Sequence, residues 1–115
     1  PHALKALLAS LESHFPDYQK TILFTCIQTK ALNEMLALLK MVPTSRVLLT
    51  TFEDSRSFST GEMQCLAKQE KLAYVEWLPY LEQYKKAKHG EKELLLITGS
   101  LYFLAEVRKY LMSDR

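Results

Sequence analysis

A strand–turn–helix pattern near the end of the sequence constrains the fold most. Residues 94–97 form an uninterrupted apolar run that is too short for a helix and that ends at the turn containing Gly99 and Ser100. Such a run is typical of a strand that is buried on both faces of a parallel sheet. Residues 101–111 return to helical spacing, and Ser100 is the expected cap of that helix. The turn therefore gathers free backbone N–H groups at a point where an anion could bind.

The rest of the chain alternates between the two kinds of pattern. Helical spacing covers residues 1–15, 31–41, 60–70 and 79–88, and strands are predicted at residues 21–27, 46–52 and 73–77. Alternation with short linkers predicts an α/β fold of three layers, in which helices cover both faces of a mostly parallel, Rossmann-like sheet. Because a doubly wound sheet normally begins with a strand, we expect a further strand before Pro1 that this sequence does not include.

Length and charge limit the classes of function. A chain of 115 residues is expected to form one domain, over residues 1–115. The net charge of +2 does not indicate nucleic acid or a membrane surface as a partner, and no apolar run is long enough to span a bilayer. Cys26 and Cys65 are too few for a disulfide framework, and both lie in predicted core elements. Reduced thiols and a cytoplasmic location are therefore expected.

Polar side chains follow the predicted strands. Lys30 comes after the first strand, Arg56 lies in the loop after the second, and Ser100 and Tyr102 follow the last. In open parallel sheets, ligands bind beyond the carboxyl ends of the strands. Since these ends offer hydroxyl and cationic groups, the pattern favours a site for an anion over a site that binds a metal directly. Neither GxGxxG nor GxxxxGK[ST] occurs, so a self-sufficient dinucleotide or P-loop site is not expected.

Each of these residues also has an ordinary structural interpretation. Ser100 can be a helix cap and nothing more, arginines in loops such as Arg56 are most often solvated, and a lysine that opens a helix, such as Lys30, is common. The three histidines lie on separate predicted elements without acidic or cysteine partners at metal-ligand spacing, so no metal site is predicted. No residue of the chain is assigned a catalytic role.

The chain resembles the folylpolyglutamate synthase and dihydrofolate synthase family, which is part of the Mur ligase superfamily. Residues 98–102 read TGSLY and are followed by EVR at residues 106–108, similar to the TGSLY and GEVR-like C-terminal signature of the family. Residues 1–4, PHAL, are similar to the tail of the Asp-Gly-Ala-His-Asn-Pro-His motif and the helix after it, where the family's C-terminal domain begins. The resemblance covers essentially the whole chain, and it accounts for the additional strand that we expect.

This resemblance implies an ATP-dependent ligase that joins L-glutamate to folate through an acyl phosphate, with Mg²⁺ as a further cofactor. It implies that the domain closes on an upstream P-loop ATPase domain, which binds most of the ATP. Arg56 and Lys30 are implied as contacts of the nucleotide phosphates. Ser100, Tyr102 and His2 are implied as contacts near the glutamate. The full-length protein is expected to be a cytoplasmic monomer, and the chain alone is expected to be inactive, because the Asp and the first His of the opening motif are absent.

The sequence departs from the family pattern in three places, and other functions stay open. Residues 25–31 keep only the lysine of an Asp-Lys-Asp-like stretch, residues 55–57 keep only the arginine of a Pro-Arg-Ala-like segment, and Ala105 stands where glycine is common. One alternative is a Mur ligase relative that acts on another carboxylate, such as a cell-wall precursor or a cyanophycin-like polymer. Another is a bifunctional enzyme that is also a dihydrofolate synthase. A third is a non-catalytic α/β module, either receiver-like or protein-binding.

Overall fold

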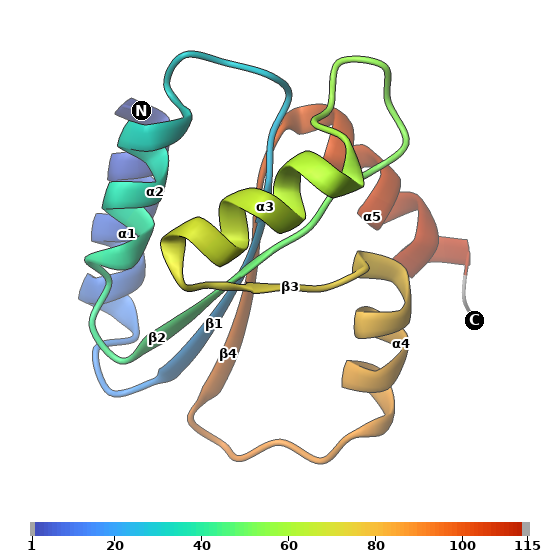
Figure 1. Ribbon diagram of the computed structural model, residues 1–115. Helices are drawn as coiled ribbons and strands as arrows, with labels where there is room; N and C mark the ends of the chain where they lie inside the picture. Colours follow the sequence, from blue (N-terminus) through green and yellow to red (C-terminus); the bar gives the residue numbers. More distant parts are fainter. Residues whose placement is uncertain (1, 114–115) are drawn as a thin grey trace.

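The computed structural model describes residues 2–113, in which helices and strands alternate (Figure 1). The strands β1 to β4 form one sheet in the order β3-β2-β1-β4, and every neighbouring pair is parallel. The predicted α/β fold with a parallel sheet is therefore confirmed. The bounds of the elements are α1 His2–His14, β1 Gln19–Thr25, α2 Leu32–Lys40, β2 Ser45–Leu49, α3 Thr60–Glu70, β3 Ala73–Tyr74, α4 Trp77–Lys86, β4 Glu93–Gly99 and α5 Leu101–Ser113.

The sheet separates two layers of helices, as predicted. Ile22 and Phe24 of β1 pack with the apolar side chains of α1, α2 and α3. Leu23, which points to the other face, packs with α4 and α5. All three side chains are fully buried, so β1 is the centre of the sheet and of both hydrophobic clusters. Because all strands run the same way, their ends define a carboxyl edge and an amino edge of the sheet (Figure 1).

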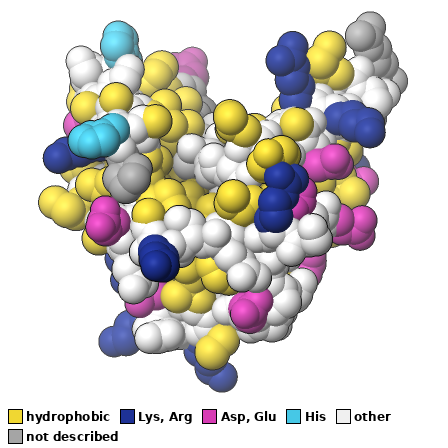
Figure 2. Space-filling model, turned by 90° about the horizontal axis from the view of Figure 1, so that it is seen from above, with side chains coloured by type: hydrophobic (Ala, Val, Ile, Leu, Met, Phe, Trp, Pro, Cys, Tyr) yellow, Lys and Arg dark blue, Asp and Glu magenta, His cyan; other side chains and the backbone are white. Residues whose placement is uncertain are grey.

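The last strand differs from its prediction. Residues 94–97 of β4 are only partly buried, and Thr98 is the one buried residue of the strand. The reason is that β4 pairs with β1 on one side only and forms an edge of the sheet among the described residues. Figure 2, which looks onto the carboxyl edge from above, shows hydrophobic side chains at the centre of this face and around a notch in it. An unbroken apolar run thus lies here at an edge and not in the middle of the sheet.

The segment around α4 also differs from its prediction. The strand predicted over residues 73–77 is short, because β3 covers only Ala73–Tyr74. Trp77 already belongs to α4, and its ring packs edge-on against Phe103 and Tyr110 of α5. Pro79 was expected to start this helix and instead lies in its first turn, where a missing N–H costs nothing. The helix ends at Lys86, before the Gly90 that was expected to stop it.

A fully buried lysine lies at the amino edge of the sheet. The Lys20 ammonium donates to the backbone carbonyls of Tyr18 (3.1 Å) and Pro43 (3.4 Å), and it lies 3.7 Å from the Glu12 carboxylate of α1. A buried charge is tolerated only when it is paired in this way. Lys20 therefore joins α1, β1 and the turn before β2.

None of the described helices has the length and the apolar content that a membrane span requires.

Candidate functional site at the carboxyl edge

Gly99 fixes the turn at the end of β4. Its backbone has a φ of +132°, and a Cβ atom at this position would lie 1.6 Å from the carbonyl oxygen of Thr25. The same carbonyl accepts a hydrogen bond of 3.1 Å from the N–H of Ser100. Only glycine allows the two strands to approach so closely in this conformation. The turn therefore places Ser100 directly beside the end of β1.

Ser100 caps α5, as predicted. Its hydroxyl oxygen accepts a hydrogen bond of 3.1 Å from the N–H of Tyr102, and its carbonyl accepts one of 3.0 Å from Leu104. One cap does not satisfy all the N–H groups that the first turn of a helix leaves unpaired. The start of α5 keeps the positive end of the helix dipole at the carboxyl edge, which favours a negative charge there.

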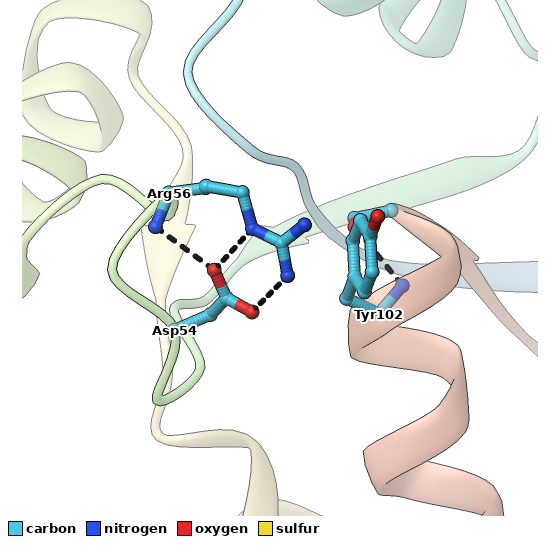
Figure 3. Close-up of polar contacts among 4 residues, drawn as sticks. Asp54, Arg56 and Tyr102 are labelled. Atoms are coloured by element: carbon cyan, nitrogen blue, oxygen red, sulfur yellow. Dashed lines mark hydrogen bonds and ion pairs between the residues drawn. The ribbon is translucent and has the colours of Figure 1, made fainter.

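Arg56 is held in place by Asp54 and Tyr102 (Figure 3). Its Nε and Nη2 donate hydrogen bonds of 2.8 and 2.7 Å to the two carboxylate oxygens of Asp54, and its backbone N–H donates another of 2.8 Å to the same side chain. The guanidinium carbon lies 3.5 Å from the centre of the Tyr102 ring, which is a cation–π contact. The loop after β2 is thereby fixed against the start of α5.

The Asp54–Arg56 pair is charged over the whole physiological pH range. The hydrogen bonds from Arg56 lower the pKa of Asp54 from 3.8 to about 2. The Asp54 carboxylate, followed by Tyr102, in turn raises the pKa of Arg56 above its usual value. Nη1 of the guanidinium lies outside the two bonds to Asp54. Asp54 thus orients the permanently charged guanidinium of Arg56 and partly neutralises its charge.

The loops after β1 and β2 are tied together by backbone contacts. The N–H of Gln28 donates a hydrogen bond of 2.8 Å to the carbonyl of Arg56, and Ile27 forms an isolated antiparallel bridge with Ser57. The Gln28 side chain adds a bond of 3.4 Å to the Ser57 carbonyl. Sequence reasoning did not identify Gln28 or Asp54. The Asp-x-Arg spacing was a usable signal for Asp54, because such an aspartate can accept from the N–H two residues later.

Of the five predicted site residues, contacts of the structure bring three together. Ser100, Tyr102 and Arg56 form one cluster, which we call the Ser100–Arg56 cluster. Lys30 is exposed in the turn before α2, and among residues 2–113 it makes no side-chain contact with this cluster. His2 is the exposed first residue of α1, and within the same part of the chain it makes no contact with the cluster either.

A hollow at the same edge of the sheet has an unexpected charge. It has a volume of about 750 Å³ and contains no lysine or arginine among its described lining residues. This corrects the expectation that the strand ends offer mainly hydroxyl and cationic groups. We call it the acidic hollow, after its five carboxylates, which belong to Glu53, Asp54, Glu62, Glu76 and Glu106.

Two of these carboxylates belong to the starts of helices. Glu62 completes a capping box with Ser59 at the start of α3, in which its carboxylate accepts 2.8 Å from the Ser59 N–H. Glu76 is the N-cap residue of α4 and accepts a hydrogen bond of 3.3 Å from the Tyr74 hydroxyl. Acidic side chains are favoured at helix N-termini, which in this fold lie at the carboxyl edge. Helix capping therefore accounts for part of the negative charge.

The wall of the acidic hollow also carries hydroxyl and aromatic groups. The Thr51 hydroxyl lies 2.8 Å from the Tyr74 hydroxyl and 3.3 Å from that of Thr60. The rings of Phe52 and Trp77 complete the wall and both pack on Phe103. Such a wall can pack against a flat apolar group and accept hydrogen bonds at its rim.

The cysteines differ from each other. Burial raises the pKa of the Cys26 thiol to about 11, so this residue packs as a small apolar side chain, as predicted. Cys65 was also expected in the core, but it lies on the exposed side of α3. Among residues 2–113 no group of three or more His, Cys, Asp or Glu side chains could hold a metal ion.

Comparisons with known proteins identify the fold. No family model matches the sequence, and no curated protein matches it. The structure is similar to the crystal structure of Helicobacter pylori folylpolyglutamate synthetase, with a TM-score of 0.71 and 19% sequence identity. The similarity covers 99% of this chain and 27% of that chain, so the sequence corresponds to about a quarter of the solved protein. The fold expected from the resemblance is therefore confirmed.

Proposed function

We propose that this chain is the C-terminal domain of a folylpolyglutamate synthase, an ATP-dependent ligase that adds L-glutamate to folate. The observation that supports this most is the similarity of nearly the whole fold to the H. pylori synthetase. A second observation is that Ser100 and Tyr102, which belong to the TGSLY stretch of the sequence, lie at the carboxyl edge. That edge is where parallel sheets bind their ligands.

In this proposal the start of α5 binds a carboxylate of the incoming glutamate. The Ser100 hydroxyl and the unpaired N–H groups of the first turn are donors, and the helix dipole favours the negative charge. The Tyr102 ring packs against the Arg56 guanidinium and holds it in position. The guanidinium then binds a phosphate or a carboxylate. Lys30 and His2 remain proposed contacts of the nucleotide phosphates and of the glutamate, to be completed in the full-length protein.

The carboxyl edge would close on an upstream P-loop ATPase domain. Two apolar residues at the start of α5 are unusually exposed, Leu101 at 81% and Tyr102 at 50%. Covering them would remove water from the site, which protects an acyl phosphate from hydrolysis. Bound ATP would supply the phosphate that activates the folate carboxylate. We propose that Mg²⁺ is bound mostly by the upstream domain, and we assign no step involving this ion to the residues of this chain.

The open edge of β4 fits the same proposal. Residues 94–97 of β4 are half-buried, and among residues 2–113 this strand has a neighbouring strand on one side only. In this proposal a strand from another part of the full-length protein pairs there and buries residues 94–97 from both sides. We propose a cytoplasmic monomer for the full-length protein, with this edge filled from within its own chain.

An assay of glutamate ligation tests the proposal. The full-length gene product is incubated with ATP, Mg²⁺, labelled L-glutamate and a reduced folate, and glutamylated folate is measured. The expected result is ATP-dependent product, and none from the 115-residue chain alone. Absence of product from the full-length protein under these conditions, while a different carboxylate is ligated, would favour another Mur ligase activity. Product formed by the chain alone would contradict the role assigned to the upstream domain.

A further inference from the structure

A second charged hollow lies at the amino edge of the sheet, opposite the Ser100–Arg56 cluster. It has a volume of about 390 Å³ and is bounded by the end of α2, the start of β2 and the turn between α3 and β3. Its cations are Lys40, Arg46 and Lys71, and no described carboxylate lines it. We call it the basic hollow. Three cations from three different elements thus face one cavity of small-molecule size.

The charge of the basic hollow is only partly neutralised. The Lys40 ammonium donates to the Glu70 carboxylate at the end of α3. Within residues 2–113, Arg46 and Lys71 form no ion pair and no side-chain hydrogen bond. Two exposed cations therefore remain without a partner at a concave surface, where their fields add because the hollow has apolar walls of Val47 and Leu72.

Backbone conformation points to the same place. Thr44 (φ 55°) and Lys71 (φ 59°) are the two residues other than glycine with positive φ in the described chain. Thr44 directly precedes the lining residue Ser45, and Lys71 itself lines the hollow. Left-handed backbone is unfavourable for residues with a Cβ, and such residues gather at functional sites. Glycine would end α3 with less strain, but it would not supply a charge.

Helix capping explains only part of this arrangement. Lys40 and Lys71 lie at the C-terminal ends of α2 and α3, where the helix dipole favours a cation. Arg46 belongs to a strand and gains nothing from a helix dipole. Because Arg46 lines the same hollow as the two lysines, the three cations form a cluster that capping alone does not explain.

We propose that the basic hollow is a binding site for a small polyanion that carries several phosphate or carboxylate groups. Arg46 would bind one anionic group through its planar fork of donors, and Lys71 and Lys40 would supply point charges to the others. The site lies at the edge opposite the proposed ligase site and does not depend on that function.

The test is an NMR titration of the ¹⁵N-labelled chain with pyrophosphate and, separately, with citrate, at about 0.15 M salt. We expect saturable shifts at the amides of Arg46, Lys71 and Ala73, with smaller shifts at Ser100. Saturation by pyrophosphate alone indicates a phosphate ligand, by citrate alone a carboxylate ligand, and by both a general polyanion site. Shifts that do not saturate and that sodium chloride at equal ionic strength reproduces would overturn the proposal.

A pair of variants separates binding from folding. Lys71→Gly removes the charge and also removes the unfavourable φ, so the protein should fold at least as well while its affinity for the saturating anion falls at least about fivefold. Arg46→Gln should weaken binding by about tenfold or more. Lys109→Gln on α5 makes the same change in net charge away from the hollow and should leave affinity within about twofold. Unchanged affinity in both Lys71→Gly and Arg46→Gln would overturn the proposal.

Discussion

The two edges of the sheet carry hollows of opposite charge. The acidic hollow at the carboxyl edge has five carboxylates and no described cation, while the basic hollow at the amino edge has three cations and no described carboxylate. The helices of this fold run antiparallel to the strands, so helix N-termini lie at the first edge and helix C-termini at the second. Capping preferences then place acids and bases on opposite edges.

This contrast teaches how the charge of a site should be inferred in such a fold. Residues that follow strands, such as Lys30 and Arg56, suggested a positive carboxyl edge. The residues that start helices, such as Glu62 and Glu76, make the hollow negative. The charge of a hollow therefore depends on the residues at the ends of helices as well as on those at the ends of strands. Helix capping does not explain Arg46 in the basic hollow or Glu106 in the acidic hollow.

The largest effect is expected at the turn that forms the carboxyl edge. Gly99→Ala would bring a Cβ into the Thr25 carbonyl, and we expect it to destabilise the fold by about 3 kcal/mol or more. Urea unfolding of the chain measures this. Gly61→Ala is the matched control, because a Cβ at Gly61 would meet only the Ser59 hydroxyl oxygen, at an ordinary contact distance of 4.0 Å. Alanine also favours the helix α3, so about 0.5–1 kcal/mol of added stability is expected. Equal unfolding midpoints for both variants would contradict the close approach at Gly99.

The buried lysine at the amino edge should have the next largest effect. Lys20→Ala removes the partner of Glu12 and two carbonyl contacts, and we expect a loss of about 2 kcal/mol. Lys20→Met keeps the apolar stem without the charge and should cost less, about 1 kcal/mol. Thermal unfolding of both variants checks the order. A Met variant that is less stable than the Ala variant would show that packing of the stem is unimportant here.

At the basic hollow we expect the replacement of Lys71 by glycine to raise the stability of the chain. Lys71→Gly should stabilise the chain by about 1 kcal/mol, because the αL position no longer strains a Cβ. Lys68→Gly, one turn earlier and inside α3, should instead cost about 1 kcal/mol through helix propensity. Urea unfolding distinguishes the two. A loss of stability in Lys71→Gly would mean that its charge, and not its backbone, dominates at the amino edge.

The smallest effect concerns pH and the Asp54–Arg56 pair. The pKa of Asp54 is about 2 in the folded chain, against an ordinary value of 3.8. A lowered folded-state pKa gives stability that is complete above the ordinary value and is lost as the pH falls toward the folded-state value. The stability difference between the wild type and Asp54→Asn should therefore shrink between about pH 5 and about pH 2. Glu53→Gln is the control, and a difference independent of pH would contradict the pairing.

Much of the fold could be predicted from the sequence because its signals are local. Helical spacing, apolar runs and the Gly99–Ser100 turn each act within a few residues, and the alternation of elements then fixes a parallel sheet. The burial of β4 could not be predicted, since a run of leucines reads the same at an edge and in the centre. The start of α4 at Trp77 depended on ring packing against α5, which no local pattern encodes.

The site could be predicted only where residues are adjacent along the chain. Ser100 and Tyr102 follow from the strand–turn–helix pattern. The contact between Arg56 and Tyr102 joins loops far apart in sequence, so its geometry needed the structure. The acidic hollow was missed because its carboxylates come from separate loops and helices, each of which has an ordinary interpretation alone.

The central claim is that ligation takes place at the carboxyl edge of the sheet. The most direct test measures ligation by variants of the full-length protein that are changed at one edge or at the other. Ser100→Ala and Arg56→Ala should each lower the rate of ATP-dependent glutamate addition to a reduced folate by about tenfold or more, through lost donors to an anionic group. Arg46→Gln should leave the rate at saturating substrate within about twofold. The account would be contradicted by carboxyl-edge variants that keep the full rate.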